Sequence, residues 1–115
     1  MPGFFIANPT PLTTLSLLIK NEPAVTAAAL RFAKASSDTN AHIYCVFFYG
    51  RGVLHATGLE KQFWSEWSRS VGARLVLCSA SAETFGLKAD GDFSVEGLGA
   101  LVEAGLTSSK VVSFG

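Results

Sequence analysis

Four continuous apolar runs, separated by segments of helical character, constrain the fold of this chain more than any other feature. The runs cover residues 13–19, 41–50, 73–78 and 110–114, and they lack the strict alternation of a half-exposed strand. Continuous apolar strands are typical of a parallel sheet that is buried on both faces. We therefore expect an α/β fold with three layers, in which helices cover both faces of a mainly parallel sheet.

Helices are predicted in three of the intervening segments. Residues 21–36 are rich in alanine, and residues 59–72 place Trp64 and Trp67 on one apolar face. These tryptophans are expected to serve core or subunit packing. Residues 94–109 form a third helix, which its glycines weaken.

The remaining segments are expected to be connections within a single domain of residues 1–115. Residues 1–12 are predicted to be an N-terminal extension, because two prolines separate its apolar start from the first strand. Residues 50–58 are predicted to form a loop, and residues 79–86 a turn or short helix.

Composition narrows the possible partners. Hydrophobic residues make up 49% of the chain and charged residues only 16%, which favours an oligomer whose subunits bury apolar faces against each other. Nine basic residues balance nine acidic residues, so direct, tight binding of nucleic acid is not expected.

Neither a membrane anchor nor a cofactor is expected. No apolar run approaches the roughly 20 residues that span a bilayer, and the N-terminus lacks the features of a signal peptide. The expected location is the cytoplasm. The two cysteines match no zinc-binding pattern, so no metal is predicted.

Chemistry is expected at the carboxyl ends of the strands, where open α/β sheets place their sites. Cys78 ends one strand and precedes a predicted turn or helix, whose free N–H groups would favour a thiolate. A thiolate can hold sulfane sulfur as a persulfide, and Cys78 would then be partly accessible and more reactive than Cys45. The alternative is an inert, buried cysteine. The candidate supporting residues are Tyr49, Arg51, His55, Ser79 and Ser81.

Three further features are candidates, and each has a simpler structural explanation. His55 could position or protonate a sulfur group on Cys78, but a solvated loop histidine is the simpler account. Cys45 lies in the middle of a strand and is expected in the core. The "GLGA" segment at 97–100 is an incomplete phosphate-binding motif inside a predicted helix, so helix packing explains it better.

Three segments resemble the DsrE/TusD family of sulfur-relay proteins. They are "VFFYGRGVLHA" at 46–56, "LVLCSASAETFG" at 75–86 and "FSVEGLGALVEAGLTSSKVVSF" at 93–114. Trp64 also falls where TusD-like chains carry a tryptophan. The resemblance covers nearly everything from residue 13 onward and agrees with the expected fold.

The resemblance implies that Cys78 accepts sulfur as a persulfide and passes it on. A sulfur donor protein, TusB- and TusC-like subunits and a TusE-like carrier are the implied partners, and the 2-thiouridine of a tRNA wobble base is the implied destination. In the DsrE branch the same cysteine would serve dissimilatory sulfur oxidation. A non-catalytic assembly subunit and a small-molecule binding module are the other possibilities.

This sequence departs from the family pattern close to the expected site. The segments 52–64 and 86–93 are shorter than usual, and Thr84 and Phe85 stand before Gly86 where the family often has an arginine. These changes affect the surroundings of Cys78, but the cysteine itself is retained.

Overall fold

A five-stranded parallel sheet lies at the centre of the molecule. The computed structural model describes residues 13–36 and 38–115; the predicted extension, residues 1–12, lies outside them. The strand order is β5-β4-β3-β2-β6, and each strand pairs in parallel with its neighbours. In chain order, the elements are β2 (Thr13–Ile19), α1 (Ala27–Ser36), β3 (Ala41–Phe48), the 3-10 helix η1 (Gly50–Ala56), α2 (Gly58–Val71), β4 (Arg74–Cys78), α3 (Ser79–Thr84), β5 (Phe93–Glu96), α4 (Gly99–Thr107) and β6 (Lys110–Phe114).

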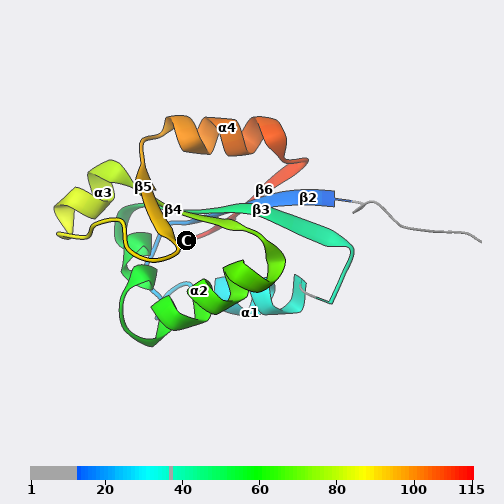
Figure 1. The fold of residues 1–115 in the computed structure, drawn as a ribbon, viewed down its shortest axis with the longest axis horizontal. Helices are drawn as coiled ribbons and strands as arrows, with labels where there is room; N and C mark the ends of the chain where they lie inside the picture. Colours follow the sequence, from blue (N-terminus) through cyan, green and yellow to red (C-terminus); the bar gives the residue numbers. More distant parts are fainter. Residues whose placement is uncertain (1–12, 37) are drawn as a thin grey trace, which may run out of the picture.

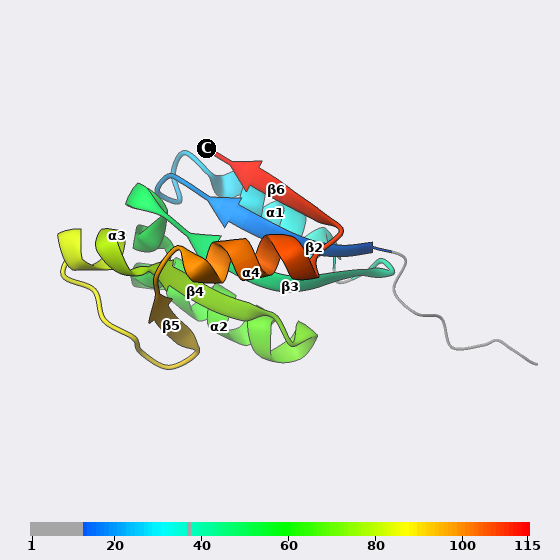
Figure 2. The same ribbon diagram turned by 90° about the horizontal axis from the view of Figure 1, so that it is seen from above.

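Helices cover both faces of this sheet, which confirms the predicted three-layer α/β fold. Helices α1 and α2 pack on one face, and α4 lies on the other (Figure 1). The view from above shows α4 as a single helix crossing the sheet (Figure 2). The two faces are therefore covered unequally, by two helices on one side and essentially one on the other.

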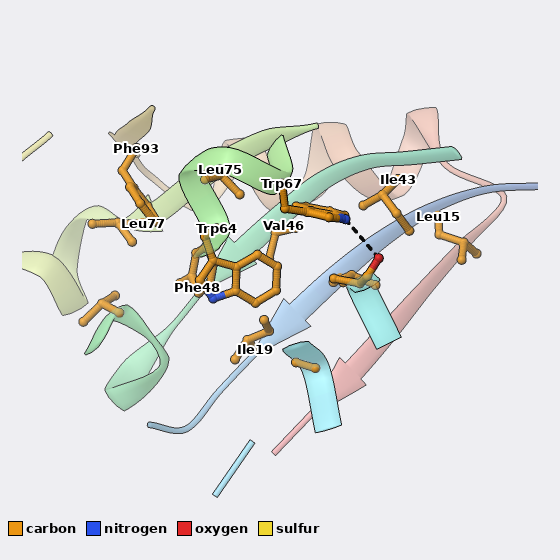
Figure 3. Packing of buried hydrophobic residues seen from close by; sticks show 14 of the residues in the cluster. Leu15, Ile19, Ile43, Val46, Phe48, Trp64, Trp67, Leu75, Leu77 and Phe93 are labelled. Atoms are coloured by element: carbon orange, nitrogen blue, oxygen red, sulfur yellow. Dashed lines mark hydrogen bonds between the residues drawn. The ribbon is translucent and has the colours of Figure 1, made fainter. Parts of the chain in front are cut away.

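Most of the core lies between the sheet and the α1/α2 layer. The strands contribute side chains that alternate in direction, so Val46 and Phe48 face this layer. Trp64 is fully buried among them, and the Trp67 indole N–H donates a hydrogen bond of 2.9 Å to the carbonyl oxygen of Ala33 (Figure 3). Of the two roles expected for these tryptophans, core or subunit packing, the structure shows packing in the core.

Small side chains attach α4 to the opposite face. Ala100 and Ala104 pack there against β3 and β4, beside Phe47. Polar contacts complete the attachment: Glu103 accepts hydrogen bonds from the Tyr44 hydroxyl at 2.6 Å and from the Arg74 guanidinium at 3.3 Å. The helix is thus fixed to the sheet by its alanines, by the partly buried Leu101 and by a few partly exposed polar groups.

A close backbone contact at Gly52 brings η1 onto the end of β2. The Tyr49 N–H donates to the carbonyl oxygen of Ile19 at 2.9 Å, and the Gly52 N–H donates to the carbonyl oxygen of Tyr49 at the same distance. A Cβ atom at Gly52 would lie 2.0 Å from the Ile19 oxygen, well inside van der Waals contact. Only glycine fits this crossing without a shift of the backbone.

The structure corrects the prediction for residues 94–109. Residues 93–96 form the strand β5 rather than the start of a helix, and α4 begins only at Gly99. Pairing with β4 decides this, because Phe93 lies opposite Leu75 and Glu96 opposite Cys78 in the parallel ladder. A tertiary partner has overridden the local helical preference of the segment.

Two further boundaries differ from the prediction. Helix α1 begins at Ala27 rather than at Asn21 or Glu22, because a separate turn precedes it. In this turn the N–H groups of Val25 and Thr26 both donate to the Glu22 carbonyl oxygen. Residues 50–56, predicted as a loop, form the 3-10 helix η1.

Candidate functional site

Cys78 is the last residue of β4, and α3 follows it without a connecting loop. Its side chain points to the α4 face, where it joins Phe47, Val76 and Ala100 in one apolar cluster. Only 4% of Cys78 is exposed, so it is less accessible than its position at a strand end suggested. The burial arises because the start of α4 packs over this end of the strand.

Cys78 nevertheless lines a cavity of about 340 Å³ at the carboxyl ends of the strands. Tyr49, Ser79 and Ser81, predicted as supporting residues, line the same cavity, which we call the Cys78 pocket. Aspartate, glutamate, lysine and arginine are all absent from its lining. The full lining comprises Tyr49, Gly50, Cys78, Ser79, Ala80, Ser81, Thr84 and Leu98.

A hydrogen bond fixes the walls of the Cys78 pocket relative to each other. The Ser81 hydroxyl oxygen accepts a hydrogen bond of 2.8 Å from the backbone N–H of Gly50. Gly50 opens η1 with a φ of +58°, so this bond ties the first turn of η1 to α3. The backbone at Tyr49, the residue before Gly50, is thereby held at the wall of the Cys78 pocket.

Arg51 lies outside the Cys78 pocket and is already engaged. Its Nε is 3.0 Å from a carboxylate oxygen of Glu22, and its guanidinium carbon stands 5.8 Å from the centre of the Phe85 ring. The hydrogen bond from Arg51 lowers the pKa of Glu22 below its usual value. The structure therefore does not bring the Arg51 charge to Cys78.

His55 does not reach Cys78 either, and it is not solvated. It is fully buried on the α1/α2 face, where Trp64 Nε1–H donates to His55 Nδ1 at 3.0 Å. The other ring nitrogen, Nε2, therefore carries the proton and donates to the Thr26 hydroxyl oxygen at 2.8 Å. Both expectations for His55 are wrong, because the indole and the hydroxyl bind it inside the core.

Comparison with known proteins decides the family. The model of the DsrE/DsrF-like family matches residues 15–114, which is almost the whole described chain. This chain belongs to the DsrE/DsrF-like family. The resemblance seen in its sequence is confirmed.

Relatives within the family carry sulfurtransferase names. A TusD sulfurtransferase of Klebsiella pneumoniae is 30% identical over 110 residues, which cover 76% of this chain and 86% of the relative. A TusD sulfurtransferase of Salmonella arizonae is 31% identical with the same coverage. A protein of Allochromatium vinosum that carries the name DsrE is 30% identical over 111 residues, or 76% of this chain and 85% of the relative.

The crystal structure of the ychN protein from E. coli has the same fold. Its TM-score with this chain is 0.64 at 12% identity, and the match covers 90% of this chain and all of that one. This likeness concerns the fold alone.

Sequence reasoning missed one large side chain of the Cys78 pocket in this DsrE/DsrF-like chain. Leu98 is 57% exposed and lines the pocket from the turn between β5 and α4. It belongs to the "GLGA" segment, for which the sequence alone favours helix packing. The strand β5 would have been the signal, because a strand ending at Glu96 delivers residues 97–99 to the carboxyl edge of the sheet.

Cys45 has the environment predicted for it. It is fully buried under α4, and burial raises the pKa of its thiol to about 11. A thiol of this kind is neutral at physiological pH and inaccessible to a second sulfur compound.

Brief alkylation is therefore expected to label Cys78 in preference to Cys45, by a factor on the order of ten or more. Cys78 lines a cavity, whereas Cys45 is both enclosed and protonated. Mass spectrometry of peptides after a short exposure to iodoacetamide measures the two rates. Faster labelling of Cys45 would show that the site has been assigned to the wrong cysteine.

The buried His55 is expected to make the fold sensitive to mild acid. Desolvation lowers its pKa from 6.5 to about 4, so the unfolded chain takes up the proton more readily than the folded chain. The stability that neutral His55 confers is complete above about pH 6.5. It falls as the pH drops towards 4, where the loss reaches about 3 kcal/mol.

Denaturant unfolding between pH 4 and 7.5 measures this loss. A His55→Gln variant should show a shallower dependence of unfolding free energy on pH, whatever its absolute stability. His42→Gln, which changes the other histidine, is the matched control, and its slope is compared with that of His55→Gln. Identical slopes for wild type and His55→Gln would contradict the neutral, buried state of His55.

No three His, Cys, Asp or Glu side chains gather into a possible metal site within residues 13–36 and 38–115. In the same part of the chain, none of the helices has the length and apolar character needed to cross a membrane.

Proposed function

We propose that this chain is a sulfurtransferase subunit of a sulfur relay, in which Cys78 carries sulfane sulfur as a persulfide. The observation that carries the proposal is the position of Cys78 in a cavity at the carboxyl ends of the strands, in a chain whose relatives are named sulfurtransferases. The other cysteine, Cys45, is enclosed in the core.

The transfer needs no external oxidant. The Cys78 thiolate attacks the outer sulfur of a persulfide on the donor, the donor's S–S bond breaks, and its electron pair leaves with the donor thiolate. A new S–S bond joins Cys78 to the sulfane sulfur, and the proton of the Cys78 thiol passes to the donor. Release repeats these steps with an acceptor thiolate attacking the sulfur held on Cys78.

The walls of the Cys78 pocket supply groups suited to a bound persulfide. Tyr49, Ser79 and Ser81 provide hydroxyl groups that can donate hydrogen bonds to a terminal sulfur anion. The surrounding apolar cluster limits the access of water, which protects a reactive persulfide from small reductants.

The relay that we propose hands sulfur from one protein to another. The TusD-named and DsrE-named relatives share the name sulfurtransferase, and we assign to this chain the transfer of sulfane sulfur between thiols. We propose TusB- and TusC-like subunits in an oligomer, a TusE-like carrier as acceptor, and a tRNA wobble 2-thiouridine as the destination in the cytoplasm. The zero net charge supports delivery through proteins, because a chain that gripped tRNA would carry an excess of positive charge.

Localisation of labelled sulfur tests the proposal. The purified chain is incubated with a cysteine desulfurase, a small sulfur carrier and ³⁵S-cysteine, and the label is mapped by non-reducing peptide mass spectrometry. We expect one additional sulfur atom on the peptide that contains Cys78, released by a reducing thiol. An unlabelled chain, or a label on Cys45, would reject the assignment and favour an assembly subunit without a sulfur-carrying role.

A further inference from the structure

The absence of charge from the Cys78 pocket limits what can bind there. Small sulfur donors such as thiosulfate are anions, and an anion site needs a cation or a set of aimed donors. The lining holds no basic side chain, and the nearby Arg51 is occupied by Glu22 and Phe85. A sulfur donor or acceptor that enters this pocket is therefore held by apolar contact and by hydrogen bonds to the hydroxyl groups of the lining, and not by ion pairs.

Exposed apolar side chains gather at this pocket. Tyr49 and Leu98 line it and are 44% and 57% exposed. Val102 and Leu106 are also exposed, and with Leu98 they follow each other at intervals of four residues, which places all three along one side of α4. We call these three residues the α4 stripe. In the described part of the chain, four of the seven large, exposed apolar side chains belong to this one surface.

The composition of α4 indicates that this side is covered by another protein. Its inner face packs Ala100 and Ala104 on the sheet, while the α4 stripe is apolar and faces outward. A helix that is apolar on both faces is normally buried on both. Yet α4 is the outermost element on its side of the sheet (Figures 1 and 2).

We propose that the α4 stripe and Tyr49 form the docking surface for the protein that exchanges sulfur with Cys78. The inference rests on the proposed function of Cys78. Since Cys78 is 4% exposed, an acceptor thiol must enter the pocket to attack its persulfide, and the segment that carries this thiol must pass Tyr49 and Leu98. The α4 stripe continues from Leu98, so the same partner covers it.

The chemistry of the surface defines the partner. It is a protein whose thiol lies in an apolar, uncharged segment. Glu103, the acidic residue of α4, is already bonded to Tyr44 and Arg74, so it adds no unpaired charge to the contact. Recognition is therefore expected to change little with ionic strength, unlike recognition between charged surfaces.

Thiol peptides of defined composition test the inference. Sodium polysulfide first loads Cys78 with sulfane sulfur, and the loaded protein is then mixed with one of three thiols. The first is glutathione, and the second is a synthetic peptide that has one cysteine among leucines and phenylalanines. The third is a matched peptide in which aspartates replace the leucines and phenylalanines. Each thiolate attacks the outer sulfur and returns Cys78 as a thiol. We expect the apolar peptide to accept sulfur faster than the other two by a factor on the order of ten.

Substitutions on α4 locate the contact. Val102→Asp combined with Leu106→Asp lies outside the Cys78 pocket, so polysulfide should load Cys78 as in the wild type, while the advantage of the apolar peptide should disappear. Leu59→Asp, which changes an 83% exposed leucine on α2, is the matched control and should leave the advantage intact.

The outcomes separate the inference from the proposed function. Loading of Cys78 followed by equal rates for all three acceptors would overturn the docking surface alone. Failure of both polysulfide and the desulfurase with its carrier to load wild-type Cys78 would overturn both. If light scattering shows that the double variant splits an oligomer into smaller species, the α4 stripe is a contact between copies of this chain and the inference is wrong.

Discussion

Substitution of Cys78 by serine is expected to abolish sulfur transfer and to leave the fold intact. A serine hydroxyl is nearly isosteric with the thiol, but it cannot form a persulfide under these conditions. The substitution should cost no more than about 1–3 kcal/mol, the range for a buried hydroxyl that lacks a partner. Because Cys78 borders a cavity lined by hydroxyl groups, we expect the lower part of this range.

Transfer of ³⁵S from a desulfurase and thermal unfolding of the same samples measure both effects. Cys45→Ala is the matched control, because it removes the other described cysteine from the core and should retain transfer despite some loss of stability. Label that stays on Cys78→Ser would transfer the carrier role to another residue. Loss of transfer in Cys45→Ala with an intact fold would also contradict the assignment.

Substitution of Gly52 by alanine is expected to produce the largest loss of stability among alanine substitutions of the described glycines. The new Cβ would stand 2.0 Å from the Ile19 carbonyl oxygen, and neither atom belongs to a flexible side chain. To relieve this clash, η1 must move away from β2. That movement lengthens the hydrogen bond from the Tyr49 N–H to the same oxygen. We expect a loss of at least about 3 kcal/mol, a large part of the stability of a small domain.

Gly105→Ala is the matched control for Gly52→Ala. A Cβ at Gly105 meets no atom within 4 Å, and alanine in a helix interior should stabilise the fold by about 0.5–1 kcal/mol. Urea unfolding of the two variants should therefore give changes of opposite sign. Equal stabilities of the two variants would show that the contact between η1 and β2 can shift without a loss of unfolding free energy.

The sheet and its two layers were predictable because they follow from long apolar runs. Strands β2, β3, β4 and β6 and the burial of Trp64 needed only the pattern of apolar residues. Strand β5 was not predictable in the same way. It has four residues, and a helical pattern follows it directly, so only its pairing with β4 distinguishes it from the first turn of a helix.

The sequence predicted those residues of the candidate site whose location depends only on their position along a strand. It did not predict the residues whose location depends on side-chain contacts. Cys78, Tyr49, Ser79 and Ser81 meet because the carboxyl ends of neighbouring parallel strands share one edge. The environment of His55 depends on the indole N–H of Trp64, nine residues further on. A hydrogen bond between side chains of different elements leaves no periodic trace in a sequence.

Helix α4 is attached to the sheet by few contacts, so it can open locally while the rest of the fold stays intact. Two buried alanines and the partly buried Leu101 form its apolar contact, two glycines lower the helical preference, and the polar contacts of Glu103 are partly exposed. Local opening of α4 therefore costs less free energy than global unfolding, so amide hydrogens in α4 should exchange with solvent before those of α1 and α2. Such an opening uncovers Cys45, and prolonged exposure to oxidants can then reach a thiol that the closed protein protects.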